Sequence, residues 1–269
     1  MISDFSSLPS IFQALLASTF TWSVTALGAG VVFLKKNIGR KLLDASLGFS
    51  AGIMVSASFF SLLLPAINIA SRGELPAWIP VSVGFLVGGL FLKLIDSLIP
   101  HLHPFMPTKR PEGIKLELSK TTLLVLAVTI HNFPEGIAIG VVFGSIASLE
   151  TAALMRAVAL TVGIAIQNFP EGMAISLPLL KKGHSKFKSF WYGQLSAIVE
   201  PIGAVLGASL VLLSKKLLPY ALAFAAGAMI YVVIEELIPE SQSSENIDIA
   251  TIGAILGFTI MMILDTALG

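Results

Sequence analysis

Cysteine is absent from the 269 residues of this chain, and charged residues are scarce. Without cysteine, the protein has no disulfide bond, no thiolate metal ligand and no cysteine nucleophile. Charged residues make up 12% of the sequence, against about 25% in a typical soluble domain, whereas 55% of the residues are hydrophobic. This composition predicts a membrane protein that lies in a lipid bilayer, and we expect no nucleic-acid partner.

Basic residues are also missing from the start of the chain. Met1 to Ser10 contain Asp4 but no lysine or arginine before the first apolar run. A cleavable signal peptide begins with a positively charged region. We therefore expect the first hydrophobic segment to remain as a membrane span.

Long apolar runs dominate what is present. Eight runs are long enough to cross a membrane as helices, and they cover approximately residues 9–34, 43–70, 77–99, 120–146, 151–180, 189–213, 217–238 and 248–268. We predict an all-α polytopic membrane protein with eight transmembrane helices in a single transmembrane domain, residues 1–269.

The basic residues predict the orientation of these spans. Twelve lysines and arginines lie in or beside the connections after the first, third and fifth spans, against four for the second, fourth and sixth. Short loops rich in lysine and arginine stay in the cytoplasm. We therefore expect loop 100–119 to be cytoplasmic and both termini to lie outside the plasma (inner) membrane.

One phrase occurs twice inside the apolar runs, as His-Asn-Phe-Pro-Glu-Gly at 131–136 and Gln-Asn-Phe-Pro-Glu-Gly at 167–172. The first residue and the glutamate of each copy are four positions apart, so they share one face of a helix. The proline removes an amide hydrogen and is expected to kink the helix, which frees a carbonyl one turn earlier. Each copy thus combines a carboxylate with imidazole or carbonyl groups at membrane depth.

Three glutamates, Glu135, Glu171 and Glu200, lie near the middle of successive spans. Left unpaired, each would cost roughly 2.5–3.5 kcal/mol in a bilayer. A divalent cation is the simplest partner, and a second cation or a proton should balance the third negative charge. Carboxylates with the imidazole of His131 suit zinc, iron, manganese or cobalt, and the lack of cysteine argues against a Cu(I) site.

The doubled phrase, together with Glu200-Pro201-Ile202-Gly203, resembles the Zrt/Irt-like (ZIP) family of metal transporters. The segments Ala-Gly-Ile-Met at 51–54 and Ala-Gly-Ala-Met at 226–229, with 235–239, are similar to its GufA-like bacterial branch. The resemblance implies a transporter, not an enzyme, that carries divalent metal ions, chiefly Zn²⁺, into the cytoplasm. Fe²⁺, Mn²⁺, Co²⁺ and Cd²⁺ stay open as further substrates, and a homodimer stays open as the assembly.

The resemblance also implies a mid-membrane site, often binuclear, on the fourth and fifth spans. Its main ion would be held by His131, Glu135, Gln167, Glu171 and Glu200. A neighbouring ion would use the shared glutamates with Asn132 and Asn168, and Met54 would lie beside them. Asn168 stands where some family members have aspartate, so the neighbouring site has one negative charge fewer.

A second polar group closes the third and seventh spans and consists of Asp96, His101, His103, Glu235 and Glu236. The resemblance implies an exit or regulatory metal site in this region. The alternative is that these are ordinary interfacial residues.

Alternating access is the transport mechanism that the resemblance implies. Spans one, four, five and six would carry the ion past spans two, three, seven and eight. The inverted similarity expected between the first three and last three spans is faint, limited to 51–54, 226–229 and the later prolines Pro65 and Pro239.

Other functions for the same residues stay open at this point. The polar groups of the doubled phrase are also suited to hydrogen bonds between helices. A membrane metalloenzyme, a metal sensor or a proton-coupled carrier of an organic solute would also use buried carboxylates. The zinc-protease pattern His-Glu-x-x-His is absent, and no segment outside the spans is long enough for a large soluble signalling domain.

Overall fold

The structure is a computed structural model that describes residues 5–34, 38–98, 120–146 and 151–268. Every regular element in these ranges is helical, as predicted. Eight helical segments are long and apolar enough to cross a membrane, and they cover Ser10–Leu34, Arg40–Ala70, Trp78–Leu98, Val125–Ser145, Ala153–Lys181, Lys186–Leu213, Lys215–Ser241 and Ile247–Leu268. The predicted loop 100–119 lies outside the described residues.

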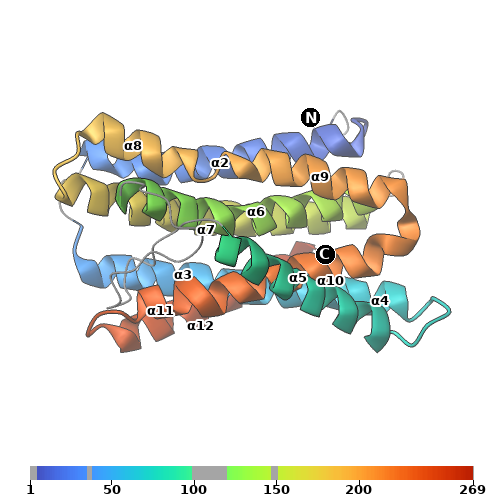
Figure 1. Cartoon of the computed structure of the whole chain (residues 1–269). Coiled ribbons are helices and arrows are strands. Elements are labelled where there is room, and N and C mark those ends of the chain that lie inside the picture. The colour runs from blue at the N-terminus through green and yellow to red at the C-terminus, as the bar shows by residue number, and fades with distance from the viewer. Residues whose placement is uncertain (1–4, 35–37, 99–119, 147–150, 269) are drawn as a thin grey trace.

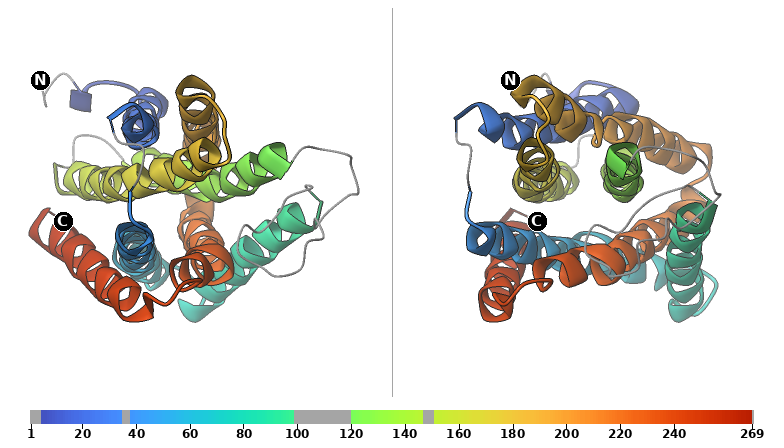
Figure 2. Two further views of the ribbon diagram at one scale, coloured as in Figure 1. Left: turned by 90° about the vertical axis from the view of Figure 1, so that its left-hand side faces the viewer. Right: turned by 60° about the vertical axis from the view of Figure 1, so that its left-hand side comes forward.

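The helices form two groups that pack face to face (Figure 1, Figure 2). One group contains α2 (Ser10–Leu34), α6 (Lys120–Ser145), α7 (Thr151–Lys181), α8 (Lys186–Leu195) and α9 (Val199–Leu213). The other contains α3 (Arg40–Ala57), α4 (Leu64–Ala70), α5 (Trp78–Leu98), α10 (Leu218–Val232), α11 (Ile238–Ser241) and α12 (Ile247–Leu268). These are the two sets of spans that the family resemblance implies, and motion of one past the other stays a prediction.

Within each group the helices pair closely, α2 with α7, α6 with α9, α5 with α10, and α3 with α12. Glycine allows two of these approaches in the doubled phrase. A Cβ added to Gly136 would lie 2.3 Å from the carbonyl oxygen of Glu200, and one added to Gly172 would lie 2.2 Å from that of Thr25. The last residue of each copy therefore brings a neighbouring backbone against the phrase.

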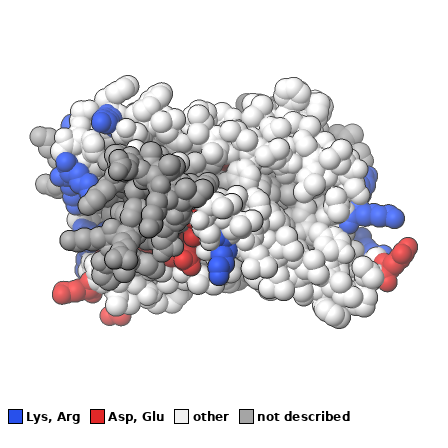
Figure 3. Space-filling model, in the orientation of Figure 1, with Lys and Arg blue, Asp and Glu red and all other residues white. Residues whose placement is uncertain are grey.

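The outer surface of the bundle is suited to lipid. On the face drawn in Figure 3, most charged side chains lie toward the two ends of the long axis, and a few lie near its middle. Large apolar side chains such as Leu86, Leu90 and Ile255 are exposed on α5 and α12. A contiguous apolar surface of this kind is unfavourable in water and favourable in a bilayer.

Two spans contain a π-helical turn at corresponding places. In the second span, η1 (Ser58–Leu63) joins α3 to α4, and in the seventh, η3 (Val233–Leu237) joins α10 to α11. Each turn starts four residues after the methionine of the related motifs 51–54 and 226–229. The two halves of the chain are therefore more alike in structure than in sequence.

The sixth span is divided just before Glu200. Helix α8 ends at Leu195 and α9 begins at Val199, so Glu200 lies in the first turn of α9 with Pro201 beside it. Proline is tolerated in a first turn, where its missing N–H has no helical partner to lose. By contrast, α6 and α7 continue as single helices through the prolines of the doubled phrase, Pro134 and Pro170.

Candidate metal centre

The three predicted carboxylates are all buried inside the bundle. Glu135 on α6, Glu171 on α7 and Glu200 on α9 are 1%, 6% and 0% exposed. Glu135 is close enough to the other two for its negative charge to be repelled by both. The sequence therefore identified a real concentration of buried charge, which must be neutralised or hydrogen-bonded.

Two amides of the second phrase copy bridge to carboxylates on other helices. The Nε2 group of Gln167 donates to Oε1 of Glu135 at 2.6 Å, and the Nδ2 group of Asn168 donates to Oε1 of Glu200 at 2.8 Å. Two successive residues of α7 thus donate hydrogen bonds to two different helices, α6 and α9. The asparagine-for-aspartate difference at 168 supplies a hydrogen-bond donor in place of a negative charge.

Helix α2 contributes a residue that the sequence analysis missed. The hydroxyl group of Thr21 donates to Oε2 of Glu200, and Asn168 also donates to the carbonyl oxygen of Thr21 at 3.3 Å. Next to it, Trp22 Nε1 donates to the carbonyl oxygen of Gln194 at 2.8 Å, just before the break in the sixth span. The available signal was a line of polar residues within an apolar span, at Gln13, Ser18, Thr21 and Thr25, all of which are buried.

Several buried oxygen atoms at this site have no hydrogen-bond partner among the described residues. They are Oε2 of Glu135, Oε1 of Glu171, Oε1 of Gln167, Oδ1 of Asn132 and Oδ1 of Asn168. Buried polar atoms are normally paired, so each of these unpaired acceptors needs an explanation. Carboxylate and amide oxygens without donors are suited to accept a divalent cation.

The predicted metal-binding side chains do not converge on one point in this structure. Across the described ranges, no three His, Asp or Glu side chains are close enough together to hold a metal ion. An ion in this arrangement would have to use amide oxygens as well as carboxylates, or draw the glutamates together. Met54 is fully buried within the hydrophobic core, and its predicted role as a ligand stays a prediction.

His131 lines the same cavity as Glu135, and the side chain that it contacts is on the other helix group. Its Nε2 atom lies 3.3 Å from Oε1 of Glu236, and both side chains are largely buried. Glu236 belongs to the polar group expected at the end of the seventh span. The structure therefore joins the two predicted groups through one contact between α6 and η3.

The rest of the second polar group is dispersed. Asp96 is buried on α5, and Glu235 is half-buried on η3 beside Glu236. Neither of the two is part of the cavity wall as far as the chain is described. His101 and His103 lie outside the described residues.

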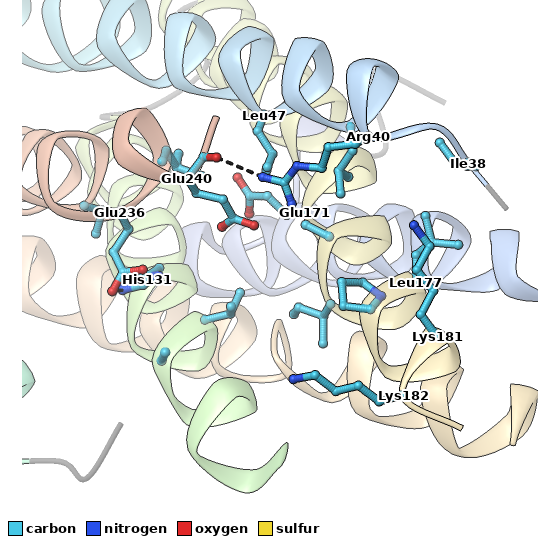
Figure 4. Close-up of a pocket in the computed structure, with 18 of the residues that line it drawn as sticks. Ile38, Arg40, Leu47, His131, Glu171, Leu177, Lys181, Lys182, Glu236 and Glu240 are labelled. Carbon is cyan, nitrogen blue, oxygen red and sulfur yellow. Dashed lines mark hydrogen bonds and ion pairs between the residues drawn. The ribbon is translucent and has the colours of Figure 1, made fainter. Parts of the chain in front are cut away.

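A cavity of about 340 Å³ leads to the phrase from one end of the bundle (Figure 4). Its wall comes from both helix groups, with α6 and α7 on one side and α3, η3 and α11 on the other. The cavity is lined by Glu135 and Glu171, both of which have an unpaired oxygen, and by Lys181 and Lys182 at and just after the C-terminal end of α7. It therefore extends from the two glutamates to one set of loops.

Acidic and basic groups both line this cavity. Glu240 of α11 lies close enough to Glu171 and Glu236 for their charges to repel. Arg40 of α3 donates to the backbone carbonyl of Glu240 at 3.1 Å and forms an ion pair with Asp44 at 2.6 Å. The guanidinium group thus offsets part of the negative charge of the cavity.

Comparison with known proteins gives a consistent result. The family model described as ZIP Zinc transporter matches residues 109–265. The chain is 43% identical to the zinc transporter ZIP11 of Homo sapiens, with 97% of this chain and 98% of that protein covered. It is 39% identical to the zinc transporter GufA of Myxococcus xanthus, over 95% and 98% of the two chains, and 38% identical to the zinc transporter ZIPB of Bordetella bronchiseptica, over 95% and 81%.

These matches cover nearly the whole chain and confirm the resemblance drawn from the doubled phrase, including its similarity to GufA. The eight apolar helices agree with them, since they form a polytopic membrane protein. The chain belongs to the ZIP family of zinc transporters.

Proposed function

We propose that this protein carries divalent metal ions, chiefly Zn²⁺, across the membrane through the site between α6, α7 and α9. One observation supports this above all others. Unpaired oxygens of Glu135, Glu171 and Gln167 are buried in the bundle, and both glutamates line a cavity that leads to one end of it. A purely structural role would leave these acceptors paired, whereas a site for a passing ion needs them free.

The ligands differ in how ready they are to receive the ion. Glu135, Glu171 and Gln167 have open oxygens, so they are proposed as the first contacts. His131 would have to leave Glu236 before its imidazole could bind the ion. Glu200 contributes negative charge to the same core, and Asn132, Asn168 and Met54 are proposed as the surroundings of a neighbouring position.

The described conformation is proposed to be the one open to the cytoplasm. Lys181 and Lys182 of the cavity wall belong to the connection after the fifth span, which the charge distribution predicts to be cytoplasmic. An ion leaving Glu171 would pass Glu236 and Glu240 on its way out. The proposed direction is therefore uptake across the plasma (inner) membrane, with both termini on the outer side.

Alternating access would follow from the two-group architecture. The proposed ligands lie on the group that contains α6, α7 and α9, and the opposite cavity wall belongs to the group that contains α3 and α11. If the first group moved along the second, the ion would lose access to this cavity and gain access to the other side.

Uptake into proteoliposomes tests the proposal. Purified protein would be reconstituted, and Zn²⁺, Fe²⁺, Mn²⁺ and Cd²⁺ would be offered separately to wild type, Glu171→Ala and the control Glu74→Ala. Glu74 is an exposed residue, so its loss should leave flux unchanged. Saturable zinc flux that disappears only in Glu171→Ala is expected.

The other outcomes distinguish the alternatives. Binding without flux in wild type would overturn the transport proposal and favour a metal sensor or a metalloenzyme. Flux that persists when both Glu135 and Glu171 are replaced by alanine would show that the ion takes another path.

A further inference from the structure

Pro178 is a second proline inside α7, beyond Pro170 of the doubled phrase, and the helix continues through it to Lys181. Proline has no N–H group, so the carbonyl of the residue four positions earlier, Ala174, lacks the donor that an α-helix normally supplies. The proline ring also crowds that carbonyl. The doubled phrase and its carboxylates do not account for this second interruption of the helical hydrogen bonds.

The freed carbonyl belongs to the face of α7 that lines the cavity. Residues four positions apart share a helix face, and both Ala174 and Pro178 line the cavity and are partly exposed. Glu171 also lines it and precedes Ala174 by about 4.5 Å along the helix axis, at 1.5 Å per residue. Helix carbonyls point toward the C-terminus, so this one lies between Glu171 and the loop end of the cavity.

The same stretch of α7 offers a passing ion no polar side chain. Between Glu171 and Lys181, the residues of α7 that line the cavity are all apolar, namely Ala174, Ile175, Leu177 and Pro178. In membrane proteins, backbone carbonyls of interrupted helices line cavities and coordinate cations. A carbonyl oxygen binds a cation through its dipole and without a net charge, and a site on a conduction path must bind weakly enough to let the ion leave.

We propose that the backbone carbonyl of Ala174, freed by Pro178, is a further ligand for the divalent ion, which it accepts from Glu171 on the way to the loop end of the cavity. This inference rests on the proposed function, because it concerns the next contact on the same path. Pro178 is then a positioning residue that acts through its missing N–H group. The alternative is that Pro178 only bends α7.

Two variants at position 178 separate the missing N–H group from the shape of the helix. Pro178→Ala restores an N–H group that occupies the carbonyl of Ala174, and alanine favours the helix. The α-hydroxy analogue of alanine, introduced by nonsense suppression, has the same side chain but an ester oxygen in place of the N–H group. We expect Pro178→Ala to lower zinc flux into proteoliposomes several-fold and the ester variant to recover most of it.

Binding and release in detergent give a second readout. Zinc affinity, measured by calorimetry, should be the same in wild type and both variants, because Glu135 and Glu171 are unchanged and the carbonyl lies on the path from them. The rate at which a fluorescent chelator removes bound zinc should fall several-fold in Pro178→Ala and recover in the ester variant. Pro80→Ala is the matched control: Pro80 is buried in the first turn of α5, where proline interrupts no helical hydrogen bond. It should keep wild-type flux and release.

The outcomes separate this inference from the proposed function. Flux and release at wild-type rates in Pro178→Ala would overturn the inference and leave transport intact. An ester variant no faster than Pro178→Ala would show that the bend of α7 matters and the N–H group does not, which also overturns it. No zinc flux in wild type would instead contradict the proposed function.

Discussion

Glu135 and Glu200 are chemically identical and equally buried, yet their surroundings differ. Each receives one amide hydrogen bond from α7, through Gln167 or Asn168. Glu200 has a second donor in Thr21 and no unpaired oxygen, whereas Glu135 keeps one oxygen open and lines the cavity. We infer that burial alone does not decide the role of a membrane carboxylate, and that its unpaired oxygens and its access to a cavity also matter.

The largest effect is expected when both glutamates with an unpaired oxygen, Glu135 and Glu171, are removed. Replacing both Glu135 and Glu171 by alanine should reduce zinc flux to that of protein-free liposomes, because the open carboxylate oxygens are lost. Radioactive or fluorescent zinc uptake measures this loss. Glu74→Ala serves as the control with unchanged flux, and residual saturable flux in the double variant would contradict the proposed site.

The two amides of α7 provide a matched pair. Gln167→Ala removes an open oxygen and the donor to Glu135, so we expect the affinity for zinc to fall by about 10- to 100-fold, as for supporting residues in metal sites. Asn168→Ala acts on the Glu200 side and should change the affinity for the first ion much less. Isothermal titration calorimetry of both variants measures the difference, and equal losses would remove the distinction between the two sides.

Lowering the pH should weaken zinc binding at Glu135 and Glu171. Carboxylate and imidazole ligands must be deprotonated to bind a metal ion, so metal binding releases protons. The apparent affinity should therefore fall as the pH is lowered, by about tenfold per pH unit for each proton released. Titrations in buffers of different ionisation enthalpy give the number of protons, and an affinity independent of pH from 7 to 5 would argue against carboxylate ligation.

The smallest effect is expected outside the core. Glu236→Gln removes one negative charge from the cavity wall that the leaving ion would pass and leaves Glu135 and Glu200 unchanged, so flux should fall several-fold while the number of ions bound at Glu135 and Glu171 stays the same. Glu235→Gln is the neighbouring control, since Glu235 does not line the cavity. Uptake rates and ion counts together test this, and an ion lost in Glu236→Gln would place Glu236 at that site.

The local sequence pattern was sufficient to predict the membrane spans and two of the buried carboxylates. Apolar runs predicted the helices, because a backbone in lipid must satisfy its own hydrogen bonds and so becomes helical. The doubled phrase identified Glu135 and Glu171, since a carboxylate is too costly in an apolar span to occur without a function. These inferences need only residues that are near each other in the chain.

Contacts between distant segments needed the folded chain. Thr21 and Glu200 are 179 positions apart, and His131 meets Glu236 across the interface between the two helix groups. The break before Glu200 lies between Leu195 and Val199, where Trp22 of α2 donates to the carbonyl oxygen of Gln194.

The sequence by itself determined the class of the protein, the eight spans and the identity of the buried carboxylates, because hydropathy and charge are properties of each residue. Only the tertiary structure decided which carboxylate oxygens are open and which are occupied. A hydrogen bond depends on direction and on distances of about 3 Å, and the packing of α2, α7 and α9 sets both.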